Sequence, residues 1–210
     1  MAIITQEQIM DVMSKCYQAA LDGLPGSKSC EELAREYMDR YKASTIAAKE
    51  LIKHQLLKCS ASGFITGFGG LLTLPVTVPA NVASVLYVQM RMIAALAAIG
   101  GYDVHSDEVQ TLVYLCLVGS SLTDVVKSTG IKIANKVTTN MLKKLPGAVL
   151  TKINQKVGFR LLTKFGTKGA VNLVKVVPVA GALVGAGIDY GSTKLIADKA
   201  YNAFLLGKIE

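Results

Sequence analysis

One arginine stands out among the residues that could do chemistry, because it interrupts an otherwise apolar helix. No charged residue occurs between Lys58 and Arg91. A charge in such a segment is costly unless it is paired, so the sequence predicts an anionic partner for Arg91. The isolated acids in apolar surroundings are Asp103, Asp124 and Asp189, and we predict that Arg91 pairs with one of them, Asp189 first. Two interpretations stay open: a structural ion pair that fixes a helix crossing, which is the more frequent case, and a catalytic pair.

The other residue types used in catalysis lack the neighbours that they would need. Gln89 stands two positions before Arg91 and therefore on another face of the helix, where a satisfied core amide is expected. The chain has no GxSxG motif and no cysteine with a neighbouring histidine, so we predict no catalytic residue. His105 beside Asp103 fits a cap at a helix start better than a polarised imidazole.

The cysteines and histidines do not form a metal-binding pattern. The four cysteines are scattered without a CxxC pair, and neither of the two histidines lies near a cysteine at zinc spacing. Free buried thiols in a reducing compartment fit this pattern. We predict neither a metal site nor a cofactor. The first residues lack the continuous apolar core of a signal peptide, so a location inside the cell is expected.

A basic stripe runs through the C-terminal half of the chain. Its members recur every four residues, and a second series of apolar residues, Ile153, Val157, Leu161 and Phe165, runs beside it with the same spacing. The basic members are Lys152, Lys156, Arg160, Lys164 and Lys168. On a helix, such side chains can reach lipid phosphates while the apolar face stays buried. The alternative is an ordinary amphipathic core helix with its lysines in water, and the pattern slightly favours it.

The net charge of +8 is unevenly distributed. Residues 1–124 carry 9 basic and 12 acidic side chains, whereas residues 125–210 carry 14 basic and 3 acidic ones. A positive C-terminal half predicts an anionic partner, either lipid headgroups or nucleic acid. Nucleic acid ranks last, because aromatic residues make up only 6% of the chain and tryptophan is absent, which leaves little for base stacking.

The apolar content of the chain exceeds that of ordinary soluble proteins. Hydrophobic residues make up 51% of the sequence, and its mean hydropathy is +0.40. Surplus apolar surface predicts contact with a membrane, an apolar ligand or a protein partner. A helix bundle rich in alanine and glycine explains the same composition equally well.

The segment Ser62–Asp103 should organise the fold. Its uncharged stretch is long enough to span a bilayer, but Pro75 and Pro79 interrupt it, and prolines disrupt a straight spanning helix. We predict two close-packed helices joined at Thr73–Pro79, the first rich in glycine and the second rich in alanine. Whether this hairpin is buried or inserts into lipid stays open.

The rest of the chain also reads as helices with recognisable ends. Residues 5–8 and 29–32 have the form of capping boxes, and the glycines at 23, 26, 100 and 101 should end helices. A long helix is expected from about residue 30 to 59, and others after Ser106 and after the break at Pro146-Gly147. Gly181 and Gly185 predict a second close helix crossing before a closing amphipathic helix. The prediction is an all-α, single-domain helical bundle, with residues 1–60 as an arm or part of the bundle and residues 61–210 as its core.

Three segments together resemble the EcsC protein family. They are GFITGFGGLLTLPVTVP, VQMRMIAALAAIGGYD and KVGFRLLTKFGTKGAVNLVKVVPVAGALVGAGIDYGSTKLIADKAYNAF, and they extend from about Ala61 to Phe204. Arg91 and Asp189 both lie within them. The resemblance implies an α-helical bacterial protein with some membrane connection, since the family is named for a protein encoded beside an ABC transporter. It implies no particular activity.

These features favour a non-enzymatic helical protein at the inner face of the cytoplasmic membrane. Its expected partners are anionic lipids or an apolar ligand, with a membrane protein as a further option, and glycine-lined faces would allow self-association. The alternative is an enzyme that acts on a lipid or another apolar substrate through an Arg–carboxylate site.

Overall fold

The computed structural model describes residues 5–60, 80–118, 146–165 and 181–208. Every regular element in these ranges is a helix, and together they form one all-α domain, as predicted. In chain order the helices are α1 (Gln6–Asp22), α2 (Cys30–Tyr41), α3 (Ser44–Ser60), α4 (Ala80–Ile99), α5 (Asp107–Leu117), α8 (Gly147–Phe165) and α10 (Gly181–Leu205).

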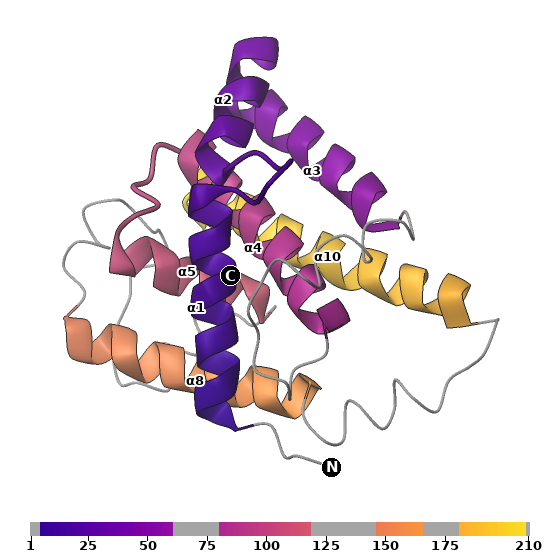
Figure 1. Ribbon diagram of the computed structural model, residues 1–210. Coiled ribbons are helices and arrows are strands. Elements are labelled where there is room, and N and C mark those ends of the chain that lie inside the picture. The colour runs from indigo at the N-terminus through magenta and orange to yellow at the C-terminus, as the bar shows by residue number, and fades with distance from the viewer. Residues whose placement is uncertain (1–4, 61–79, 119–145, 166–180, 209–210) are drawn as a thin grey trace.

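Helix α4 is the centre of the bundle. It packs against α1, α2, α3, α5 and α10, while α8 packs across α1 and α5 (Figure 1). Nearly every side chain from Leu86 to Ala97 is buried, which explains why this stretch is apolar on all sides instead of along one stripe. The two buried exceptions to its apolar character are Gln89 and Arg91.

Both predicted capping boxes are confirmed. The Thr5 hydroxyl accepts the Gln8 backbone N–H at 3.2 Å, and the Gln8 side chain accepts the Thr5 N–H at 2.9 Å. Ser29 and Glu32 form the same reciprocal pair at the start of α2, with distances of 3.2 and 2.8 Å. These bonds satisfy N–H groups that a helix start otherwise leaves without partners.

The expected long helix from residue 30 to 59 is wrong, because the chain breaks it after Tyr41. Lys42 adopts a left-handed conformation, with φ of 57° and ψ of −27°, and α3 folds back from there along α2. The Tyr37 hydroxyl and His54 Nδ1 lie 2.7 Å apart and join the two helices. No glycine or proline marks this break, so the local sequence did not indicate it.

Gly100 and Gly101 end helix α4, as predicted. The Tyr102 N–H donates to the Ala97 carbonyl and the Gly101 N–H donates to the Ala98 carbonyl, which is a Schellman motif with Gly101 at φ of 78°. Gly100 has a different role. A Cβ there would overlap the backbone carbonyl of Phe204, so Gly100 lets the end of α10 approach α4.

Helix α8 begins directly after Pro146, at the predicted break. Its residues Ile153, Val157 and Leu161 are buried in the core. Gly158 lies against Met10 of α1, and the Gln6 amide donates to the Gln155 carbonyl at 2.8 Å. The glycine inside α8 therefore serves its crossing with α1.

Three predicted features lie outside the described residues. They are the glycine-rich first half of the hairpin with its joint at Thr73–Pro79, the first part of the positively charged C-terminal half (residues 125–145), and the stretch 166–180 that contains Lys168. The side chains of residues 181–190 also lie outside the description, although their backbone forms the first part of α10.

Candidate functional site

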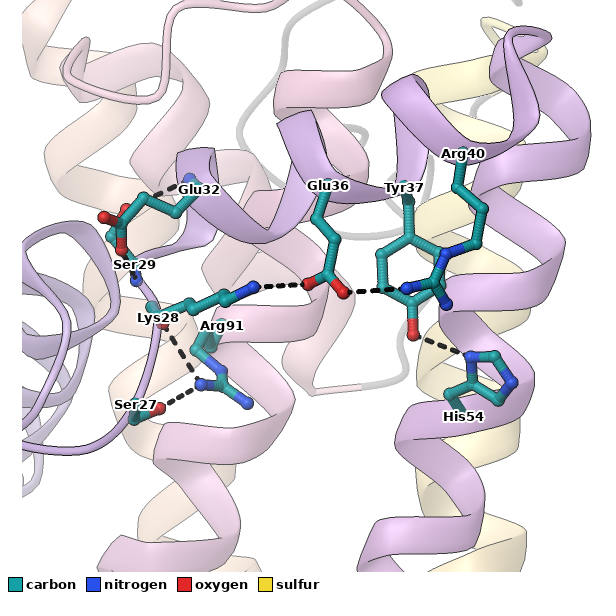
Figure 2. A network of polar contacts seen from close by, with 9 residues as sticks. All are labelled: Ser27, Lys28, Ser29, Glu32, Glu36, Tyr37, Arg40, His54 and Arg91. Carbon is teal, nitrogen blue, oxygen red and sulfur yellow. Dashed lines mark hydrogen bonds and ion pairs between the residues drawn. The ribbon is translucent and has the colours of Figure 1, made fainter.

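Arg91 lies in the middle of α4 with its guanidinium buried against the connection between α1 and α2. Only 4% of the residue is exposed. Its Nη1 donates to the Ser27 hydroxyl and, at 3.1 Å, to the Lys28 carbonyl (Figure 2). Both partners precede α2, whose first turn begins after the cap at Ser29.

Tyr87 completes the surroundings of this guanidinium. The centre of its ring lies 5.6 Å from Arg91 Cζ, and its hydroxyl lies 3.2 Å from the Ser27 hydroxyl. Tyr87 stands one helical turn before Arg91 and is fully buried. An aromatic face near a cation stabilises its charge in a desolvated position.

The partners of Arg91 in the described part of the chain are neutral. No ion pair between Arg91 and a carboxylate occurs there, and Arg91 Nε is buried without a hydrogen-bond partner. Among the described residues, two neutral acceptors and one aromatic ring surround the guanidinium and no carboxylate offsets its charge, which is costly in a buried position.

The Cys30 thiol lies close to the same charge. Burial raises the pKa of Cys30 to about 12, and the Glu31 carboxylate also raises it, while the backbone N–H groups of Glu31 and Cys30 and the Arg91 guanidinium act to lower it. The thiol therefore stays protonated between groups of both charges. The predicted state of the cysteines as free buried thiols is confirmed for Cys16, Cys30 and Cys116.

None of the three predicted acidic partners is seen beside Arg91. Asp103 is exposed, and its carboxylate accepts the backbone N–H of His105 at 3.0 Å, as a loop cap does. Asp124 and the side chain of Asp189 lie outside the described residues. A pairing of Arg91 with Asp189 stays a prediction.

The Gln89 side chain contacts α10, whereas Arg91 contacts the connection between α1 and α2. Its Nε2 donates to the Thr193 hydroxyl of α10 at 2.9 Å, and both residues are buried, with exposed fractions of 3% and 1%. A buried amide bonded to a buried hydroxyl fixes how α10 crosses α4. By contrast, both polar atoms of the fully buried Gln55 side chain on α3 lack a hydrogen-bond partner among the residues that the structure describes.

The predicted basic stripe is partly described, and it follows the outer side of α8. Lys152 and Arg160 are exposed and Lys156 is half-buried. The side chain of Lys164 and all of Lys168 lie outside the described residues. Phe159, which the sequence analysis did not single out, is 58% exposed on this same side.

Neither the partners of Arg91 nor the contact between Tyr37 and His54 was predictable from the sequence. Ser27 lies 64 residues before Arg91, in a loop that the sequence marked only as a helix stop. Tyr37 was assigned to one continuous helix that included His54, and such a helix could never bring the two rings together. The one feature of the sequence that could have indicated the Arg91 partners is the polar pair Ser27-Lys28, directly before a capping box.

The described ranges contain neither a membrane-spanning helix nor a metal-binding group of side chains. No helix there is both long and apolar enough to cross a membrane. No group of three or more His, Cys, Asp or Glu side chains there could hold a metal ion.

The comparison with known proteins identifies the family. No curated protein and no solved structure matches the chain significantly. The model of the EcsC protein family, however, matches residues 5–206. This match begins well before Ala61, so α1, α2 and α3 belong to the shared pattern as well. Since the match covers nearly the whole chain, this protein belongs to the EcsC protein family.

Proposed function

We propose that this protein docks on the anionic inner face of the cytoplasmic membrane without catalysing a reaction, with the outer side of α8 as the contact surface. We call this surface the α8 face and define it as Lys152, Lys156, Phe159 and Arg160. The positive charge of residues 125–210 supports an anionic partner.

The α8 face combines two chemistries that a membrane interface favours. Positions 152, 156, 159 and 160 fall on one side of a helix, because they are separated by three, four and eight residues. Long basic side chains can reach phosphates while an aromatic ring between them enters the headgroup region. The observation that carries the proposal is the position of the exposed Phe159 among three basic residues on one side of α8, because basic and aromatic side chains together favour a membrane interface.

The buried side of α8 limits how the contact forms. Ile153, Val157 and Leu161 pack inside the bundle and are at most 1% exposed. The apolar series beside the basic stripe is therefore occupied by the protein core, as the amphipathic core-helix alternative expected. Binding would depend on charge and on Phe159, which predicts a salt-sensitive and reversible attachment.

Vesicle cosedimentation tests the proposal. We expect binding to vesicles of phosphatidylcholine with phosphatidylglycerol, and little binding to phosphatidylcholine alone. The double variant Phe159→Ser/Arg160→Ala should weaken binding by about tenfold or more, since one basic residue near an anionic surface contributes about 1 kcal/mol and the ring adds its own burial.

The matched control is the adjacent pair Lys194→Ala/Leu195→Ser on α10. The Lys194 side chain is 56% exposed and Leu195 is 53% exposed, so this variant removes one charge and one apolar group from another surface. It should bind as the unaltered protein does. Equal losses in both variants, or no binding at physiological salt, would exclude the α8 face as the contact.

An enzyme that acts on a lipid or another apolar substrate is the second candidate. The buried and uncompensated Arg91 favours it, because binding sites often contain such a charge. It ranks second since the described partners of Arg91 are neutral and no general base that could activate the Ser27 hydroxyl lies among them. Turnover of a phospholipid that Arg91→Lys abolishes would reverse this order.

A further inference from the structure

No described residue supplies a counter-charge for Arg91, which points to a ligand. Only 4% of the Arg91 residue is exposed, and its Nε–H faces no acceptor in the described part of the chain. Its Nη1 is bonded to a hydroxyl and a carbonyl, which carry no formal charge. A buried guanidinium normally has a carboxylate or phosphate partner, often through two parallel bonds.

Several further donors converge on the same place. The loop Gly26-Ser27-Lys28-Ser29 leads directly into α2, whose first turn presents the positive end of the helix dipole. The backbone N–H groups of Cys30 and Glu31 act together with Arg91 on the Cys30 sulfur, and the Glu31 carboxylate, which lies 3.5 Å from His105 Nε2, acts against them. Figure 2 shows Arg91 reaching from α4 to Ser27 and Lys28 of this loop, with the Lys28 side chain above it.

We propose that Arg91, together with Ser27, Lys28 and the first turn of α2, binds a phosphate group. This site is separate from the α8 face and does not depend on it. The phosphate oxygens would replace the Ser27 hydroxyl and the Lys28 carbonyl as acceptors of the guanidinium, and the Arg91 Nε–H would gain an acceptor. The Lys28 side chain, 57% exposed, would close over the ligand from the solvent side.

Acidic neighbours set the strength of this site. Lys28 Nζ lies 3.0 Å from a Glu36 carboxylate oxygen, and Glu36 also pairs with Arg40 at 3.2 Å. A phosphate must draw Lys28 away from Glu36. The Glu32 carboxylate is held by the Ser29 backbone N–H, so it remains as a capping group. Neutralising Glu36 should therefore strengthen phosphate binding, whereas removing Lys28 should weaken it.

Calorimetric titration of the full chain with inorganic phosphate, at constant ionic strength, tests the site. We expect saturable binding of one phosphate per chain, at least about tenfold weaker in Lys28→Ala, tighter in Glu36→Gln, and absent in Arg91→Gln. The Lys28 and Glu36 variants alter exposed or half-exposed groups, so the test does not depend on whether Arg91→Gln folds.

The controls are Lys194→Ala and Asp198→Asn. Lys194 and Asp198 form a comparably exposed ion pair on α10, 3.2 Å long, so these variants repeat the charge changes elsewhere. Neither should change phosphate affinity. Equal effects at both pairs would mean diffuse attraction and would overturn the site, as would an absence of saturable binding. If phosphate binds only after Asp189→Asn, Arg91 already has an internal partner and the proposal is wrong.

Vesicles separate the two sources of a phosphate group. Vesicles of phosphatidylcholine with phosphatidic acid present it on a lipid, whereas inorganic phosphate presents it free. Loss of free-phosphate binding in Lys28→Ala with unchanged vesicle binding assigns the site to a soluble ligand. If Lys28→Ala loses both free-phosphate binding and vesicle binding, the site recognises the phosphate group whether it is free or part of a lipid. The variant Phe159→Ser/Arg160→Ala should leave free-phosphate binding unchanged, so failure of the α8 face is distinguishable from failure of this site.

Discussion

At the scale of single residues, Arg91 shows what a charge in an apolar helix requires. The chain places a hydroxyl, a carbonyl and an aromatic ring around it instead of a carboxylate from the described residues. Neutral acceptors orient the guanidinium but do not cancel its charge. The Ser27 and Lys28 acceptors thus fix the guanidinium in one geometry, and in the proposed phosphate complex its buried Nε–H would gain an acceptor.

Gly100 allows a sharper test of a single position. A methyl group there would overlap the Phe204 carbonyl and approach the Tyr102 ring at 3.1 Å, and backbone cannot move aside cheaply. We expect Gly100→Ala to lower the free energy of unfolding by about 1–3 kcal/mol, the usual cost of overpacking. Urea denaturation followed by circular dichroism measures the change.

Gly191 provides the control for that substitution. It lies in α10 with no atom within 4 Å of the position that a Cβ would take. Alanine should therefore stabilise the helix there, by about 0.5–1 kcal/mol, because it removes the entropic cost of glycine. If both variants shift the urea midpoint in the same direction, the close approach of α10 to Gly100 is not what that glycine provides.

At the scale of elements, the turn between α2 and α3 decides how the N-terminal part folds. Lys42 is the only non-glycine residue with positive φ in the described ranges, and a left-handed conformation is unfavourable for a residue with a Cβ. The contact between Tyr37 and His54 and the packing of α3 against α4 and α10 outweigh this cost.

Replacing Lys42 by glycine should remove that cost. We expect Lys42→Gly to raise the free energy of unfolding by up to about 1 kcal/mol, since glycine adopts positive φ readily. Lys53→Gly, at a position inside α3 where the lysine side chain is 65% exposed, should instead lower it by about 1 kcal/mol. Thermal unfolding of both variants gives the comparison, and a loss of stability in Lys42→Gly would contradict the strained turn.

How far each element could be predicted depended on local signals. Both ends of α1, the C-terminal end of α4 and the start of α5 were predictable, because hydroxyl caps and glycines act on their own neighbours in sequence. The break at Lys42 was not, since tertiary packing produces it. Arg91 was recognisable from its charge, but its contacts with Ser27 and Lys28 depend on how the α1–α2 loop lies on α4. No pattern within either segment contains that information.

At the scale of the whole molecule, three buried thiols make stability sensitive to alkaline pH. Burial raises the pKa values of Cys16, Cys30 and Cys116 from 9.0 to about 12. Above pH 9 the unfolded chain releases thiol protons that the folded protein retains. The unfolded state then binds fewer protons, so stability falls as the pH rises from about 9 towards 12.

Urea midpoints measured at pH 7, 8 and 10 test this dependence. We expect little change between pH 7 and 8 and a clear decrease at pH 10, because one group can contribute about 1.4 kcal/mol per pH unit within the affected window. A variant with alanine at all three cysteines should lose less stability over the same range. An equal decrease in both proteins would assign the effect to other groups, such as the tyrosines, of which Tyr17 and Tyr114 also have raised pKa values.

The central position of α4 also determines the order in which the helices can pack during synthesis of the chain. This helix is complete at Ile99, yet α10, which covers one of its sides and supplies Thr193 to Gln89, begins only at Gly181. During translation, the side of α4 that packs against α10 therefore lacks this partner until residues 100–180 have been synthesised. A nascent chain stalled before α10 should therefore recruit a chaperone through α4, and release from the ribosome should precede the last docking step.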